Sequence, residues 1–126
     1  MIWLPTFEQV CLLHEKAIAA TGGSPALRDP GLIESALFRA RSAYGGVEAY
    51  PSLEAKAAAV GCGLIQNHGF IDGNKRTGVL CMLLILHHNG VQLRYTQREL
   101  IDLGLQIAQS QMDAEATALW IGQHKL

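Results

Sequence analysis

The chain alternates amphipathic stretches with short polar breaks, which is the pattern of a helical protein. Apolar residues recur every three or four positions, for example at Leu100, Leu103 and Ile107, so each stretch has one face for a core. Helix-start residues precede these stretches, and glycine or Asn-Gly pairs follow several of them. The signals predict helices over residues 7–20, 30–43, 53–68, 74–88, 97–110 and 114–123.

Two segments interrupt the helical pattern. Tyr44–Ser52 contains paired glycines, a proline and alternating apolar residues, so we expect either a short β-hairpin or an exposed flap. Val91–Tyr95 has the composition of a short extended piece. With so little strand, the expected fold class is all-α, a helical bundle.

The fourth predicted helix differs from the others because it has no polar face. Its run Val79–Leu86 consists of apolar residues only, and a helix that is apolar all round is normally buried on most sides. We therefore expect helix 74–88 to be the central helix, enclosed by the others. The apolar run is far too short to span a bilayer.

Composition and charge narrow the class of protein. The chain has 126 residues, 49% of them hydrophobic, which fits a single folded domain over residues 1–126. A net charge of -1 argues against broad binding to nucleic acid or to an anionic membrane. The first ten residues lack the pattern of a signal peptide, so the expected location is the cytoplasm. Cys11, Cys62 and Cys81 form no C-x-x-C pair and are expected to be buried free thiols.

The charged residues near the fourth helix are clustered rather than spread. Residues 57–93 contain only three Asp, Glu, Lys or Arg residues, and these three, Asp72, Lys75 and Arg76, lie within five positions. They stand where helix 74–88 is expected to begin, and a helix N-terminus has free backbone N–H groups and the positive end of the dipole. That N-terminus together with two cations predicts an anion-binding site.

The stretch NHGFIDGNKRTG, residues 67–78, carries the groups that phosphate chemistry needs. His68 can act as a general base near neutral pH, or it can simply bond to backbone at the end of a helix. Asp72 offers the oxygen ligands that Mg²⁺ prefers, and it can also cap the helix that follows. Gly73 lets the backbone approach an anion closely. Hydrogen-bond donors and positive charges for phosphate oxygens come from Asn74, Lys75 and Arg76.

A base, a metal ligand and a phosphate cradle within nine residues suggest phosphoryl or nucleotidyl transfer. The stretch is not a Walker A loop, because its lysine follows an asparagine and no strand precedes it. Residue by residue, HGFIDGNKR resembles the signature of the Fic/Doc (Fido) family, H-x-F-x-[DE]-[GA]-N-[GK]-R between two helices. The upstream DPGLIESAL and the Asn-Gly after the fourth helix resemble the death-on-curing (Doc) toxin branch, and the resemblance covers about residues 10–95.

The resemblance implies a Fido fold with a β-hairpin flap that holds a target protein. It also implies transfer from a nucleoside triphosphate to a protein hydroxyl. By this resemblance His68 deprotonates a Ser or Thr hydroxyl and Asp72 holds Mg²⁺. The residues that bind the phosphates of ATP are then Gly73, Asn74, Lys75 and Arg76.

Two positions favour phosphorylation over adenylylation. The adenylylating branch has glycine in place of Lys75 and a second arginine in place of Val79. Both departures match the Doc branch, whose members resemble protein kinases that act on a translation elongation GTPase and so arrest translation. Adenylylation (AMPylation) of a protein hydroxyl is the alternative activity, and a non-catalytic Fido interaction module is the alternative class.

The same resemblance predicts a partner and leaves other residues with structural roles. Toxins of the Doc branch are held in check by a Phd-like antitoxin, whose C-terminal segment folds onto an apolar groove of the toxin.

Gly69 stands where many relatives have proline, and we expect a looser loop there. His87 and His88 are adjacent and lack further metal ligands, so we expect no metal there, and we expect His14 at the surface or at its boundary.

Overall fold

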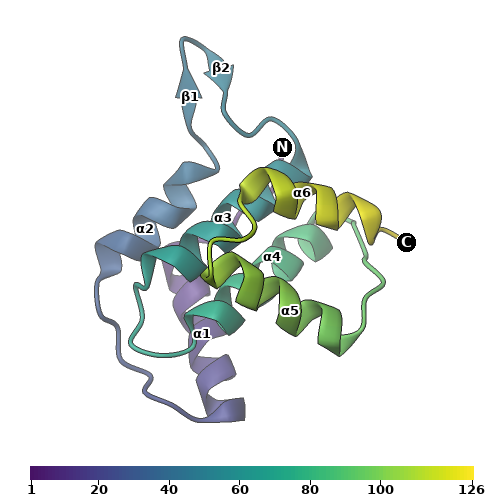
Figure 1. The fold of residues 1–126 in the computed structure, drawn as a ribbon. Helices are drawn as coiled ribbons and strands as arrows, with labels where there is room; N and C mark the ends of the chain where they lie inside the picture. Colours follow the sequence, from purple (N-terminus) through teal and green to yellow (C-terminus); the bar gives the residue numbers. More distant parts are fainter.

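The computed structural model describes residues 1–126 as six helices and one small hairpin (Figure 1). The helices are α1 (Phe7–Thr21), α2 (Pro30–Arg39), α3 (Leu53–Asn67), α4 (Asn74–His88), α5 (Gln97–Ala108) and α6 (Ala114–Gln123). The predicted all-α class is confirmed. No helix has both the length and the apolar character needed to cross a membrane.

Side chains at the helix starts explain where most of these helices begin. Thr6 and Thr96 each open a complete capping box, and a side-chain oxygen of Asp29, Ser52 or Asp113 accepts a backbone N–H at the start of α2, α3 or α6. Each such cap is worth about 1 kcal/mol. Five of the six helices therefore have a side-chain cap, and α4 is the exception.

The predicted interruptions differ in detail from the structure. Strands β1 (Ala43–Tyr44) and β2 (Val47–Glu48) form the expected hairpin, which projects from the bundle (Figure 1). Helix α2 ends at Arg39, earlier than predicted, because the chain turns there to enter the hairpin. In the segment 91–95 only Leu93 pairs, in an isolated bridge to Lys125 near the C-terminus.

The central helix is α3, and in this respect the expectation for helix 74–88 is wrong. Helix α3 packs against α2, α4, α5 and α6, and residues 56–65 are all buried. Helix α4 packs against α1, α3 and α5, and it leaves Leu80 and Leu83 partly exposed. The physical reason is size: the alanines and glycines of α3 let neighbours approach on every side, although they score lower in hydrophobicity than the leucines of α4.

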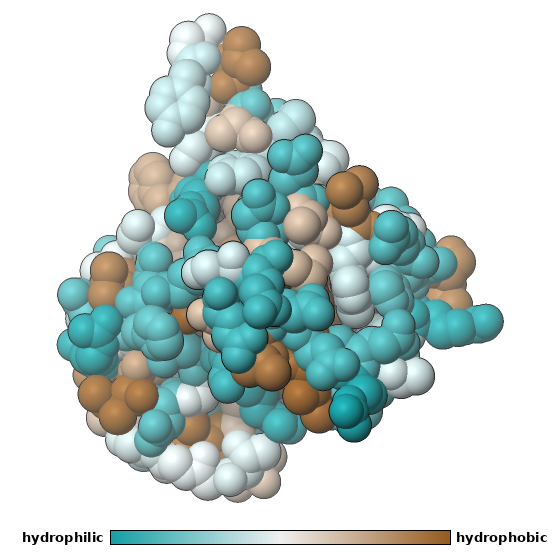
Figure 2. All heavy atoms as spheres, in the orientation of Figure 1, coloured by the Kyte–Doolittle hydropathy of each residue, from teal (hydrophilic) through white to brown (hydrophobic).

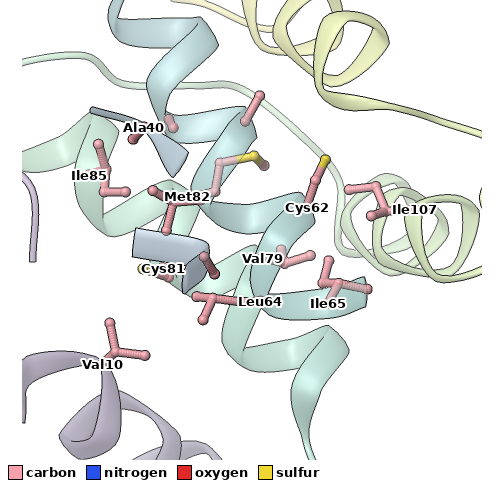
Figure 3. Packing of buried hydrophobic residues seen from close by; sticks show 14 of the residues in the cluster. Val10, Ala40, Cys62, Leu64, Ile65, Val79, Cys81, Met82, Ile85 and Ile107 are labelled. Atoms are coloured by element: carbon pink, nitrogen blue, oxygen red, sulfur yellow. The ribbon is translucent and has the colours of Figure 1, made fainter. Parts of the chain in front are cut away.

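Helices α3 and α4 come close together at two glycines. A Cβ atom on Gly78 would lie 2.8 Å from the carbonyl oxygen of Gly61 and 2.5 Å from Cγ1 of Ile65. Figure 3 shows the surrounding core, with Ile65 of α3 beside Val79 of α4. This packing sets the separation of the two helices and therefore the span of the loop between them.

We predict that Gly78→Ala lowers the free energy of unfolding by about 1–3 kcal/mol, because overpacking at this contact pushes α3 and α4 apart. Urea denaturation measures the change. The matched control is Gly122→Ala in α6, where an added Cβ has nothing within 4 Å. Better helix propensity makes that variant neutral or slightly more stable. Equal stability of the two variants would contradict the close contact.

Candidate active site

The charged stretch of residues 67–78 forms the loop that joins α3 to α4 and the first turn of α4. His68 ends α3 in the left-handed conformation, with φ 53° and ψ 49°, which is uncommon for a residue other than glycine. Its carbonyl oxygen accepts a hydrogen bond of 2.6 Å from Nε of Arg28. The His68 side chain is exposed and forms no hydrogen bond in the chain. The alternative reading, a histidine bonded to backbone at a helix end, is therefore not what the structure shows.

The segment before α2 holds the first half of the loop by backbone hydrogen bonds. The N–H groups of Arg28 and Asp29 both donate to the carbonyl oxygen of Gly69, at 2.8 and 2.9 Å, and Ile71 N–H donates to Ala26. Gly69 is buried, and a Cβ atom there would overlap the side chain of Ile33. The expectation that Gly69 loosens the loop is wrong, because the missing side chain lets the loop lie directly on α2.

Asn74 closes the loop with its side chain. Its Nδ2 donates to the carbonyl oxygen of Phe70 at 2.9 Å, and its Oδ1 accepts from the N–H of Phe70 at 3.1 Å. The residue is only 8% exposed. The side-chain amide is therefore occupied, and the polar group of Asn74 that remains free at the helix end is its backbone N–H.

His14 of α1 contacts the loop from beneath, contrary to the expectation of a surface position. It is 1% exposed, its Nε2 lies 2.7 Å from the carbonyl oxygen of Asp72, and its ring stacks on the ring of Phe70. Its spacing from Val10 and Ile18, four residues either way, places it on the buried face of α1. That periodicity was the sequence signal for its burial.

The N-terminus of α4 has no cap. Gly73 occupies the N-cap position with φ 79°, a conformation that suits glycine, and no side chain accepts from the first turn. The first backbone N–H of this turn with a partner is that of Thr77, which donates to Gly73. The N–H groups of residues 74–76 thus remain free. Asp72 is not the N-cap, because its Oδ2 accepts from the N–H of Ser24 at 2.8 Å.

The carboxylate of Asp72 fits a magnesium ion that arrives with phosphate. It is exposed, and its Oδ1 has no hydrogen-bond partner in the chain. No three His, Cys, Asp or Glu side chains gather as a metal site. Because Mg²⁺ is commonly bound through one or two carboxylates plus substrate phosphates, a single carboxylate beside an anion site is a suitable donor set.

Lys75 and Arg76 are exposed in the first turn of α4, and neither forms an ion pair. They also line one end of a groove of about 400 Å³ between α4 and α5. Its other walls are mainly aliphatic, and Figure 2 shows apolar surface over α5. The groove is completed by Val79, Leu80, Gln97, Leu100, Ile101, Gly104 and Leu105.

Other nucleophiles and metal ligands are poorly placed for chemistry. Cys62 and Cys81 are buried as expected, whereas Cys11 is partly exposed. Burial raises the pKa of the Cys81 thiol to about 12, so this thiol stays protonated. His88 stacks on Trp3 and belongs to no group of metal ligands.

The hairpin and the loop lie at opposite ends of α3. Lys56, in the first turn of α3, is buried and donates to Glu48 of β2 at 2.9 Å and to the carbonyl oxygen of Ala40. His68 lies at the other end of this 15-residue helix, which is about 20 Å away along the axis. Of the predicted site residues, the structure places His68, Asp72, Gly73, Lys75 and Arg76 on one accessible loop and helix start.

Comparisons with known proteins show the family to which the chain belongs. The family model for the Fic/DOC family matches residues 4–86. A protein named Toxin Doc, from Mycolicibacterium smegmatis, is 47% identical over 74 residues, which are 59% of this chain and 57% of that protein. The chain thus matches little more than half the length of that relative. A protein named Protein kinase doc, from Escherichia phage P1, is 34% identical over 111 residues, 88% of this chain and 86% of that protein.

We predict that Asn74→Ala lowers the free energy of unfolding by about 2 kcal/mol, because it leaves both polar groups of the buried Phe70 without partners. His68→Ala removes an exposed side chain with no hydrogen bond and changes stability by less than about 0.5 kcal/mol. Urea denaturation measures the free energy of unfolding of both variants. It distinguishes Asn74, which stabilises the loop, from His68, whose side chain is exposed on it. A stability loss in His68→Ala as large as in Asn74→Ala would contradict these assignments.

Proposed function

This chain belongs to the Fic/Doc family, and we propose that it is a Doc-type toxin that transfers the γ-phosphate of ATP to a Ser or Thr hydroxyl of a target protein. The observation that carries the proposal is the helix start at α4. Free backbone N–H groups, the positive end of a helix dipole and two unpaired cations meet there, beside a histidine whose imidazole is free. The name of the relative from phage P1, Protein kinase doc, supports the same activity.

The residues divide the work of phosphoryl transfer between them. The N–H groups of residues 74–76 and the side chains of Lys75 and Arg76 bind phosphate oxygens and stabilise the charge that develops on them. His68 accepts the proton of the target hydroxyl as its oxygen bonds to the γ-phosphorus. The bond from that phosphorus to the bridging oxygen breaks, and ADP leaves with the electron pair. Asp72 would hold Mg²⁺, which would neutralise part of the phosphate charge.

Val79 supports phosphorylation rather than adenylylation. It is 6% exposed and faces Gly104 of α5, where an added Cβ would lie 3.2 Å from its Cγ2. Position 79 therefore supplies packing to the α4–α5 interface and no charge to the phosphates. The lysine and arginine of this helix both lie in its first turn, at positions 75 and 76. That distribution suits one phosphate held at the helix end, with the γ-phosphate placed next to His68.

The proposed target is a translation elongation GTPase, as the resemblance to the Doc branch implies, so that activity arrests translation. The exposed hairpin offers backbone groups and the side chains of Tyr44 and Val47, 77% and 71% exposed, to a protein partner. Because the hairpin stands at the far end of α3, a target that touches both the hairpin and His68 has to extend along the bundle.

We propose further that a Phd-like antitoxin segment occupies the groove between α4 and α5. Ile101 and Leu105, one helical turn apart, remain 60% and 41% exposed on its rim, and such a row of aliphatic side chains suits the apolar face of a partner helix. The cationic end of the groove at Lys75 and Arg76 favours an acidic segment. An occupant there would cover the two cations that bind phosphate, which explains how binding would suppress transfer.

Phosphotransfer is tested with two samples of ATP, one labelled at the γ-phosphate and one at the α-phosphate. Each is incubated with purified protein and a bacterial lysate. We predict that one lysate protein takes label from the γ-position, and that His68→Ala and Lys75→Ala lower the rate by at least about 100-fold. The control is Lys16→Ala, an exposed lysine of α1, which leaves the rate unchanged. Label from the α-position instead would establish adenylylation, and no label from either position would favour the interaction module.

The groove is tested by placing a charge on its rim. We predict that Ile101→Asp lowers the affinity for a co-expressed Phd-like antitoxin by at least about tenfold, because a carboxylate replaces a contact buried by the partner. Phosphotransfer itself stays unchanged. The control is Leu119→Asp on α6, at a side chain that is 64% exposed outside the groove. Equal antitoxin affinity of the two variants, measured by calorimetry, would place the antitoxin elsewhere.

A further inference from the structure

We propose that His14 is a positioning residue for the transfer reaction, because it holds the phosphate loop from α1 through the carbonyl group of Asp72. The expected effect of His14 on the reaction rate rests on the proposed function, whereas its effect on the loop does not. His14 lies outside the loop, 58 residues before Asp72 in the chain. It touches neither the exposed His68 imidazole nor the free N–H groups of α4, so its effect on the reaction has to pass through the loop backbone.

His14 makes two contacts with the loop at once. Its ring lies parallel to that of Phe70, with centroids 3.7 Å apart and an interplanar angle of 7°. Its Nε2 lies 2.7 Å from the carbonyl oxygen of Asp72, and since a carbonyl only accepts, Nε2 carries the proton and donates. Gly73 leaves room for the ring, since an added Cβ there would lie 3.6 Å from the His14 ring edge. A flat ring with a donor on its edge makes both contacts.

These contacts decide where Asp72 and the start of α4 lie. The side chain of Asp72 is held by Ser24 and its carbonyl by His14, so both ends of this residue are fixed. The next residue is the left-handed Gly73, which aims the free N–H groups of residues 74–76. Loss of the His14 bond frees the peptide between Asp72 and Gly73 to rotate, which moves the carboxylate and the anion-binding N–H groups together.

Two substitutions separate the functions of the ring. His14→Phe keeps a flat ring for Phe70 and removes the donor, and His14→Gln keeps an N–H donor and removes the ring. We expect His14→Phe to lower kcat by about tenfold to a hundredfold, since small displacements in a site have effects of this size. The Mg²⁺ concentration needed for half-maximal rate rises, and KM for the target protein stays unchanged. His14→Gln recovers part of both losses, and Glu15→Ala, its exposed neighbour, serves as the control.

Amide hydrogen exchange gives a readout that needs no activity. The N–H of Phe70 donates to the Asn74 side chain, and the N–H of Ile71 donates to the carbonyl oxygen of Ala26. We expect both to exchange at least about tenfold faster in His14→Phe than in the wild type, with little change in α6. If the wild-type protein transfers no phosphate, the proposed function fails, and the exchange rates still decide the role of His14. Unchanged loop exchange in both His14 variants would overturn the proposal. The proposal would also be overturned if His14→Phe had a lower melting temperature but kept the kcat and the Mg²⁺ requirement of the wild type.

Discussion

Helices α3 and α4 pack backbone against backbone where Gly61 faces Gly78, and the geometry of the rest of the site depends on this contact. Neither glycine has room for a Cβ at its usual distance from the opposite carbonyl oxygen. The close approach leaves residues 68–73 to reverse the chain over a short span. The chain does so with left-handed residues at both ends, His68 and Gly73. The reversal turns the His68 side chain outward and leaves the start of α4 uncapped.

A loop of this kind needs support from elsewhere in the chain, because it carries a strained residue and an uncapped helix start. The support comes from α1 through His14, from the turn after α1 through Ser24, and from residues 26–29 before α2. Asn74 adds an internal bond. The absent N-cap on α4 costs about 1 kcal/mol of stability relative to the other helices, and the same groups are thereby free to bind an anion. Stability that a cap would have supplied is given up at the one helix start where a ligand is proposed.

Local signals in the sequence were sufficient for the helices and for the charged loop. Caps and glycines mark the ends of helices because they act within three or four residues. The cluster of Asp72, Lys75 and Arg76 predicts an anion-binding site as soon as a helix is expected to start there. Features that depend on distant residues were not predictable in this way. The central place of α3 follows from small side chains rather than hydrophobicity, and the roles of His14 and Gly69 follow from contacts with partners 36 to 58 residues away. For Gly69, the expected looseness ignored Ile33, which fills the space that a side chain would need.

We propose that the uncapped start of α4 binds the phosphates of ATP. Titration of the isotope-labelled protein with Mg²⁺ and ATP, followed through the backbone amide signals in two-dimensional NMR spectra, tests this directly. We predict that the amides of Asn74, Lys75 and Arg76 shift downfield most strongly, because a free N–H gains a charged acceptor, and that these shifts are reduced in Lys75→Ala. Saturable shifts confined to other residues, with these three amides unmoved, would contradict it.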